Sequence, residues 1–198
     1  MGRPPRVTAQ PGRLIVLSGP SGVGKDTVLH ELRRLDPTLR YSVSFTTRSP
    51  RADEQDGVAY SFVDELTFRD MAAHGAFLEW AQVHDHLYGT SEARVTEALE
   101  RGEDIVLKID VQGASWIRPR VAGAVFIFLL PPSTVELRRR LVARDTEDEA
   151  GLELRFSNAV DELAGGATYD HRVVNDDVSR AAREILDIVR RRREEARR

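Results

Sequence analysis

The sequence predicts an α/β fold in three layers, with a parallel sheet as its core and a small α+β region inserted into it. Three observations lead to this prediction. A glycine-rich stretch, residues 19–25, lies between a short apolar run and a helix-like segment. Apolar runs alternate with helix-like segments along most of the 198 residues, which is typical of parallel sheets. Residues 41–83 break this alternation, and this break predicts the insert.

The strands expected in the core are short apolar runs, at residues 14–17, 104–110, 124–130 and 172–175. Helices are expected between or after them, at residues 27–35, 90–100 and 133–142, and an amphipathic helix closes the chain. Ser133 and Glu136 form a capping-box pattern at the start of one helix, and Gly102 follows the end of another, where glycine is common. This alternation predicts a buried parallel sheet with helices on both faces.

The glycine-rich stretch matches the phosphate-binding loop pattern G-x-x-x-x-G-K-[ST] at every position except the last. Its glycines let backbone N–H groups surround an anion, Lys25 adds a point charge, and the following helix start adds partial positive charge. A nucleotide polyphosphate suits such a loop best, and a glycine-rich turn without a ligand is the alternative. The last position holds Asp26, where a hydroxyl ligand of Mg²⁺ is expected.

The insert is expected to contain three short strands and one helix, at residues 41–44, 58–62, 77–83 and 66–73. A polar loop between the first two strands places Arg48 and Arg51 around a proline. Arginine forks match phosphate oxygens in bidentate fashion, and the hydroxyls of Tyr60 and Tyr88 would complete a phosphate site. Alternatively, these arginines pair on the surface with acids of their own loop, such as Glu54. The residues alone leave both interpretations open.

Composition limits the classes of partner. The net charge of −3 gives no basic field for nucleic acid, the absence of cysteine excludes disulfides and thiolate metal sites, and no apolar run has the length of a membrane span. Residues 1–12 lack the apolar stretch of a secretory signal, so we expect a disordered leader and a cytoplasmic protein. The arginines from residue 190 onward are expected to be the solvated end of a helix rather than a nucleic-acid tail. The sequence is compatible with a monomer and with a homo-oligomer.

Six motifs make the chain resemble the guanylate kinase family of nucleoside monophosphate kinases, over most of its length. They lie at residues 42–51, 77–81, 88–90, 109–114, 130–133 and 174–177. The resemblance implies a P-loop enzyme of purine nucleotide metabolism that transfers the γ-phosphoryl group of ATP to GMP or dGMP. It also implies a single domain over residues 13–198, in which an insert at about 41–90 binds GMP and a helical lid spans about 138–158.

The resemblance further implies which residues form each site. The ATP site would contain Gly19, Pro20, Ser21, Gly22, Val23, Gly24, Lys25, Asp26, Thr27, Arg140 and Asn175. The GMP site would contain Ser44, Arg48, Arg51, Glu54, Tyr60, Glu79, Tyr88, Thr90, Asp110, Gln112 and Gly113. The catalytic residues would be Lys25, Arg48, Arg144 and Arg155. Mg²⁺ is expected as the cofactor that accompanies ATP, and Asp26 is its candidate protein ligand.

These residue types suit guanine and phosphoryl transfer. The carboxylate of Glu79 can accept from both the N1–H and the 2-amino group of guanine, and Ser44 can donate to O6, whereas adenine presents no such edge. Without the resemblance, Glu79 would pass for a surface acid of a strand. The attacking phosphate oxygen of GMP is already anionic, so the reaction needs positioning and charge neutralisation rather than a protein nucleophile.

Three positions depart from the family pattern. Asp26 replaces a serine or glycine, residues 144–146 lack the flexible glycine of the lid, and Lys108 stands where the family usually has an acid. We expect Lys108 to pair with Asp110 or to contact a phosphate. Two alternatives remain: a related kinase of ribose bisphosphates, which can carry Gly-Lys-Asp in its loop, and a catalytically inactive guanylate-kinase-like binding module.

Overall fold

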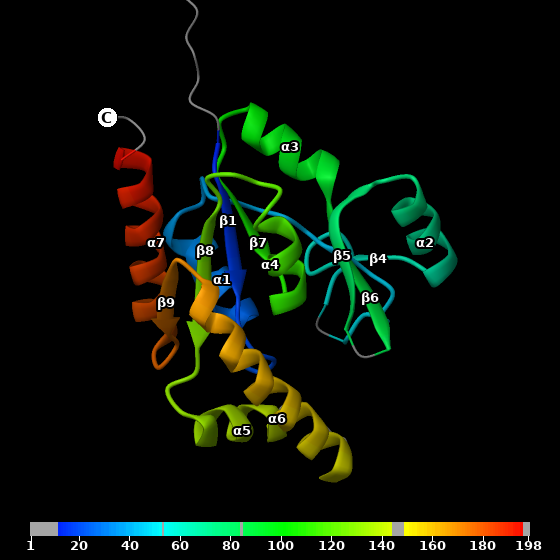
Figure 1. Cartoon of the computed structure of the whole chain (residues 1–198), viewed down its shortest axis with the longest axis vertical. Coiled ribbons are helices and arrows are strands. Elements are labelled where there is room, and N and C mark those ends of the chain that lie inside the picture. Colours follow the sequence, from blue (N-terminus) through cyan, green and yellow to red (C-terminus); the bar gives the residue numbers. More distant parts are fainter. Residues whose placement is uncertain (1–11, 53, 84, 144–148, 196–198) are drawn as a thin grey trace, which may run out of the picture.

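The computed structural model describes residues 12–52, 54–83, 85–143 and 149–195. The expected disordered leader, apart from its last residue, therefore lies outside the described residues, and so does Arg144. Figure 1 shows a central sheet between helices, a smaller sheet with its own helix to one side, and a pair of helices at one end.

A five-stranded parallel sheet forms the core, in the order β2-β7-β1-β8-β9. The strands are β1 (Leu14–Ser18), β2 (Arg40–Tyr41), β7 (Ile105–Lys108), β8 (Val125–Leu130) and β9 (His171–Val174). The predicted parallel core and its four main strands are thereby confirmed. In register, Leu17 of β1 pairs with Lys108 of β7, so the carboxyl ends of these neighbouring strands lie at the same edge.

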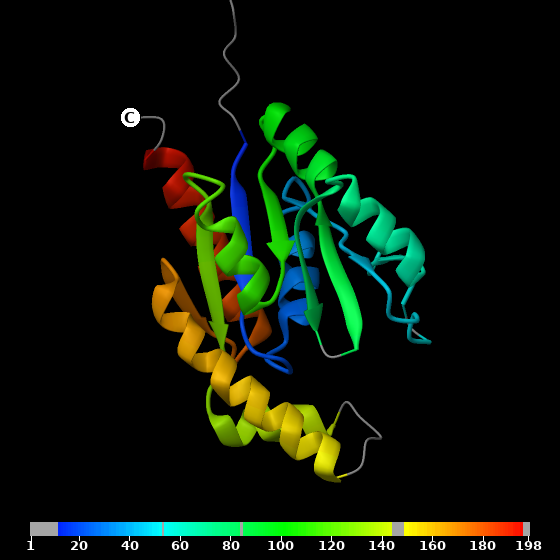
Figure 2. The ribbon, with the colours of Figure 1, turned by 45° about the vertical axis from the view of Figure 1, so that its right-hand side comes forward.

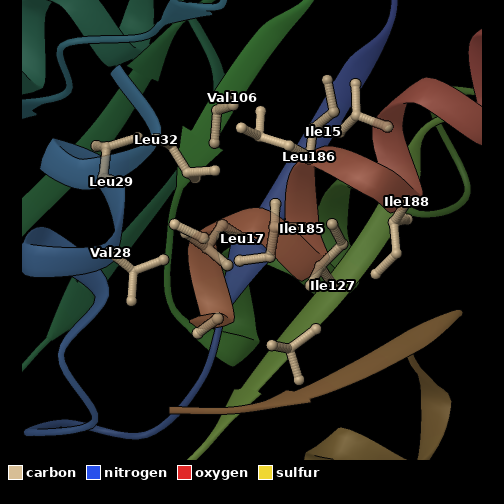
Figure 3. Close-up of a cluster of buried hydrophobic side chains, with 14 of the residues drawn as sticks. Ile15, Leu17, Val28, Leu29, Leu32, Val106, Ile127, Ile185, Leu186 and Ile188 are labelled. Atoms are coloured by element: carbon tan, nitrogen blue, oxygen red, sulfur yellow. The ribbon is translucent and has the colours of Figure 1, made fainter. Parts of the chain in front are cut away.

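Alternating residues of β1 face opposite layers. Ile15 and Leu17 join one buried cluster with helices α1 (Lys25–Leu35) and α7 (Val178–Glu195), as Figure 3 shows. Leu14 and Val16 join a second cluster on the other face. That face is covered by α3 (Glu92–Glu100) and α4 (Val111–Ile117). Burial of both faces explains why the two central strands β1 and β8 are almost entirely apolar, and it confirms the three predicted layers.

The insert forms a second, four-stranded sheet in the order β4-β3-β6-β5, with helix α2 packed on it. Its elements are β3 (Phe45–Thr46), β4 (Ser61–Phe62), α2 (Glu65–Ala73), β5 (Phe77–Val83) and β6 (His86–Ser91). β3 pairs with β4 in parallel, whereas β6 is antiparallel to both β3 and β5. The predicted α+β insert and the bounds of β5 are confirmed.

Two local predictions in this region are wrong. The strand expected at 41–44 is split, because β2 pairs with the core sheet and β3 pairs with the insert sheet. Residues 86–91 form β6, and the helix expected from residue 90 begins only at Glu92, after the Ser91 hydroxyl accepts from the N–H of Arg94. Short strands that pair with distant partners leave no local periodicity to distinguish them.

Helices α5 (Thr134–Val142) and α6 (Glu149–Ala164) pack against each other at one end of the molecule through Leu137, Leu141 and Ala159 (Figure 2). A short 3₁₀ turn, η1 (Gly165–Thr168), leads from α6 towards β9. The lid expected at 138–158 falls on this helix pair. The Ser133 hydroxyl accepts from the N–H of Glu136 at 3.1 Å, but the Glu136 carboxylate binds Arg139 and Arg140, so only half of the predicted capping box forms.

Helix α7 buries its predicted apolar side chains and keeps most of its arginines exposed. One arginine departs from the expected solvated end, because Arg193 donates to the buried carboxylate of Asp104 at 2.6 Å. Asp104 also accepts from the N–H of Arg13 at 2.9 Å, which ties the end of α7 to the start of β1. Within the described residues, no helix combines the length and the apolar character needed to cross a bilayer.

A substitution of Phe68 on α2 can test the packing of the insert. Its side chain is fully buried and stacks on Phe77 of β5, with ring centroids 4.5 Å apart. We expect Phe68→Ala to lower the free energy of unfolding by about 3–5 kcal/mol, since it removes a buried aromatic ring and leaves a cavity. Leu66→Ala is the matched control, because Leu66 lies on the same helix and is 82% exposed. Denaturant titrations that give equal losses for both variants would contradict this packing.

Candidate active site

One cavity of about 560 Å³ is lined by half of the predicted site residues. It lies between the glycine-rich loop, the insert sheet, the carboxyl end of β7 and helix α6. The predicted residues that line it are Gly19, Ser21, Lys25, Asp26, Ser44, Arg48, Arg51, Tyr60, Glu79, Tyr88, Asp110 and Arg155. Residues from the predicted donor and acceptor sites therefore face a single space.

The glycine-rich loop joins β1 to α1 at one side of this cavity. Gly24 has a φ of 97° and lies so close to the side chain of Asn175 that a Cβ there would be 2.6 Å from Nδ2. Asn175 Nδ2 donates to the carbonyl of Val23 at 2.8 Å, and Arg140 Nη1 donates to the same carbonyl at 3.1 Å. Arg140 and Asn175, which were expected in the ATP site, thus support the loop through its backbone.

An anionic group already contacts the loop. The N–H of Ser21 donates to the carboxylate of Glu162, on α6, at 2.8 Å, as it would to a phosphate oxygen. The Lys25 ammonium donates to the carbonyls of Gly19 and Pro20, at 2.5 and 3.1 Å. Burial lowers the pKa of Lys25 below its usual value, although the nearby carboxylate of Glu162 opposes this shift. Sequence reasoning missed Glu162, because its partner lies 141 positions away.

The opposite side of the cavity holds a buried carboxylate. Glu79 on β5 is only 8% exposed, and Thr90 Oγ1 donates to its Oε1 at 2.6 Å. A Cβ at Gly113 would lie 2.6 Å from Oε2 of Glu79, so the lack of a side chain at Gly113 makes room for this carboxylate. Burial, reinforced by the charge of Asp110, raises the pKa of Glu79 to about 7, against the hydrogen bond from Thr90. The alternative of a surface acid is therefore wrong for Glu79.

Two further predicted residues lie beside Glu79. Asp110 caps α4, because its Oδ1 accepts from the N–H of Gly113 at 2.7 Å, and Ser44 is 8% exposed at the cavity wall. Gln112, which was also predicted to bind GMP, is exposed on α4 and is not among the described residues that line the cavity.

The loop that carries Arg48 and Arg51 agrees with both interpretations drawn from the sequence, an ion pair with an acid of the same loop and a position at the predicted phosphate site. Arg48 Nη2 donates to both carboxylate oxygens of Glu54, at 2.7 and 2.8 Å, and Arg48 and Arg51 still line the cavity. Burial acts to lower the pKa of Arg48, but Glu54 outweighs it and the pKa is raised. The rings of Tyr60 and Tyr88 meet edge to face beside Arg48, with centroids 5.8 Å apart. Arg48 is thus held in place by an ion pair and by aromatic faces.

Lys108, at the end of β7, forms an ion pair with Asp26 and donates to the Tyr60 hydroxyl at 3.0 Å. The expected pairing with Asp110 is wrong, because the nearest carboxylate comes from the glycine-rich loop. A sequence signal existed, since two of the three departures from the family pattern, Asp26 and Lys108, carry opposite charges.

The lid helix contributes Arg155 to the cavity wall, together with Gly151 and Leu154. Arg144, the other arginine expected from the lid, lies outside the described residues. Across the described ranges, no group of three or more histidine, aspartate or glutamate side chains is arranged to hold a metal ion.

Comparison with known proteins agrees with this geometry. The guanylate kinase family model matches residues 11–192. The chain is 47% identical to the guanylate kinase of Clostridioides difficile over 178 residues, which cover 90% of this chain and 87% of that protein. It is 46% identical to the guanylate kinase of Rubrobacter xylanophilus, with 91% and 94% covered.

A solved structure leads to the same family. The crystal structure of guanylate kinase from Anaplasma phagocytophilum superposes with a TM-score of 0.78 at 33% identity, covering 91% of this chain and 86% of that one. With a P-loop, an arginine-lined insert and a buried carboxylate facing one cavity, the chain belongs to the guanylate kinase family.

Proposed function

We propose that this protein transfers the γ-phosphoryl group of ATP to GMP or dGMP, giving ADP and GDP (or dGDP), in purine nucleotide metabolism. One observation carries the proposal: the buried carboxylate of Glu79 lines the same cavity as Lys25 of the P-loop. A base and a triphosphate held at these two places would bring the acceptor phosphate and the γ-phosphate together between them.

Glu79 would select the base. When ionised, its carboxylate offers acceptor positions for the N1–H and the 2-amino group of guanine. Adenine would instead turn an unprotonated ring nitrogen towards the carboxylate and leave a buried acceptor without a donor, which is costly. Thr90 and Gly113 would support this selection by fixing the orientation of Glu79, and Ser44 would donate to O6.

The cations around the cavity would position the phosphates. Arg48, Arg51, Tyr60 and Tyr88 would hold the phosphate of GMP, while Lys25 and the loop amides would hold those of ATP. Arg155, and in the family pattern Arg144, would reach the transferring phosphoryl group from the lid. Catalysis by positioning and charge neutralisation fits a cavity that is lined by these cations.

Mg²⁺ would accompany ATP and would neutralise charge on the phosphates. Asp26 fits as its protein ligand, because it is a carboxylate that is 60% exposed, follows Lys25 of the P-loop and faces the cavity; its Oδ1 also pairs with Lys108, so the metal would share this carboxylate with the ammonium. Magnesium keeps several waters and needs only one or two carboxylates besides the phosphates, so a larger cluster is not required. A cytoplasmic location remains a prediction, which rests on the lack of a secretory-signal pattern in the sequence.

The two alternatives receive less support. A kinase of ribose bisphosphates does not recognise a base, so it would not need the buried carboxylate of Glu79. The relatives from Clostridioides difficile and Rubrobacter xylanophilus are both named guanylate kinases. A binding module without activity has no need for an ordered P-loop with Lys25 beside an acceptor site.

Substrate selectivity tests the proposal directly. We expect the protein to release ADP from ATP and Mg²⁺ rapidly with GMP or dGMP, and at least about a hundredfold more slowly with AMP or UMP, because unmet hydrogen bonds at Glu79 disfavour those bases. A coupled ADP-release assay that includes ribose bisphosphate measures this. Equal rates with AMP would rule out the guanine assignment, and turnover with the ribose substrate alone would favour the first alternative.

Two variants should separate base reading from phosphoryl transfer. Glu79→Gln should lower kcat/KM for GMP roughly ten- to hundredfold and narrow the difference between GMP and AMP, since an amide cannot accept from both donors. Lys25→Ala should lower kcat at least about a hundredfold with every acceptor. The matched control is Glu97→Gln on the exposed face of α3, which should behave as the unmodified protein. Unchanged selectivity in Glu79→Gln would contradict the proposed base recognition.

The raised pKa of Glu79 predicts a pH effect on GMP binding. Because this pKa is about 7, most Glu79 side chains are protonated at pH 6 and ionised at pH 8. Only the ionised form accepts from both guanine donors, so KM for GMP should fall about tenfold between pH 6 and pH 8. The GMP phosphate also titrates near pH 6, and Glu79→Gln serves as the control that retains this contribution. An identical pH profile in Glu79→Gln would show that Glu79 does not titrate in this range.

A further inference from the structure

Lys108 joins the two halves of the cavity through one ammonium group. It is the last residue of β7, and its side chain is only 11% exposed. Its Nζ pairs with the carboxylate of Asp26 on the P-loop side and lies 3.0 Å from the hydroxyl of Tyr60 on the insert side. All three residues line the cavity. A substitution of Lys108 therefore removes one contact on the P-loop side of the cavity and one on the insert side.

The choice of lysine at this position is unusual for this chain. The sequence contains 27 arginines and only two lysines, Lys25 and Lys108, and both lysines line the cavity. Apart from these two lysines, arginine supplies the permanently charged cationic side chains of the protein. An ammonium is a compact charge that donates in three directions, whereas a guanidinium is a larger, planar fork. The ammonium of Lys108 uses two of these directions, one towards Asp26 and one towards the Tyr60 hydroxyl.

The hydrogen bond from Lys108 determines what the Tyr60 hydroxyl can do. An ammonium has no acceptor, so the Tyr60 oxygen accepts this bond and the hydroxyl hydrogen remains to donate elsewhere. Burial raises the pKa of Tyr60, while the charge of Lys108 opposes this shift, so the phenol keeps its hydrogen at neutral pH. The guanidinium of Arg48 lies over the same ring, with its central carbon 5.5 Å from the centroid. Tyr60 thus offers a donor within the group expected to bind the acceptor phosphate.

We propose that Lys108 is a positioning residue for the acceptor phosphate: it fixes the Tyr60 hydroxyl as a donor towards the phosphate of GMP, and Asp26 holds Lys108 in place. This inference rests on the proposed function and deepens it. It gives two of the three departures from the family pattern a common role, because the added carboxylate of Asp26 is balanced by the added ammonium on β7.

Kinetics of a double-mutant cycle tests the inference. Lys108→Met should raise KM for GMP about tenfold with smaller changes in KM for ATP and in kcat, because the Tyr60 hydroxyl is then no longer held as a donor towards the acceptor phosphate. Tyr60→Phe should raise the same KM, and adding Lys108→Met to Tyr60→Phe should raise it little further. The inference would be overturned if Lys108→Met raised KM for GMP by the same factor with and without Tyr60→Phe. An unchanged KM for GMP in Lys108→Met, or a rise in its KM for ATP equal to that for GMP, would overturn it as well. Far-ultraviolet circular dichroism checks that each variant folds.

Selective ¹³C-lysine labelling gives a test on the unmodified protein, since only two lysine side-chain signals are expected. The Lys25→Ala variant assigns them. We expect GMP to shift the Lys108 signal, and guanosine, which lacks the phosphate, to shift it much less. A Lys108 signal that GMP leaves in place, in a protein that phosphorylates GMP, would overturn this inference alone. Failure to bind or phosphorylate GMP at all would overturn the proposed function together with it.

Discussion

The cavity depends on the parallel pairing of β1 and β7. Because the two strands run side by side in register, their carboxyl ends deliver the P-loop and residues 108–110 to the same edge of the sheet. Lys25 starts the helix that follows β1, and Asp110 caps the helix that follows β7. The insert sheet packs against this second helix through β5 and thereby places Glu79 beside Asp110 and Gly113. The proposed donor and acceptor sites would thus share one boundary, which phosphoryl transfer between two bound nucleotides requires.

Local charge balance is the second recurring feature. In the described part of the cavity and its surroundings, three cations are held by acids of their own chain: Arg48 by Glu54, Lys108 by Asp26, and Arg140 by Glu136. Each pair fixes the direction of a cation. Such preorganisation lowers the cost of ordering long side chains when phosphates bind. It also explains how a chain of net charge −3 can assemble a site for two polyanions.

The sequence was sufficient wherever the signal is local. The P-loop is defined by its glycines and Lys25, the central strands β1 and β8 by their apolar runs, and β5 by the alternating character of its residues between Phe77 and Val83. It was insufficient where the partner is distant. The split between β2 and β3, the contact of Glu162 with Ser21 and the pairing of Lys108 with Asp26 all depend on residues brought together by the sheet. Two-residue strands also carry too little periodicity to be assigned to one sheet or another.

The central claim is that one cavity holds a guanine nucleotide and an adenosine triphosphate with their phosphates facing each other. The most direct measurement is competition by a bisubstrate analogue in which adenosine and guanosine are joined by five phosphates. The account predicts that this compound displaces both nucleotides and binds at least about a hundredfold more tightly than GMP, while the diadenosine counterpart binds far more weakly. Displacement of only one nucleotide, or equal affinity for the two analogues, would contradict it.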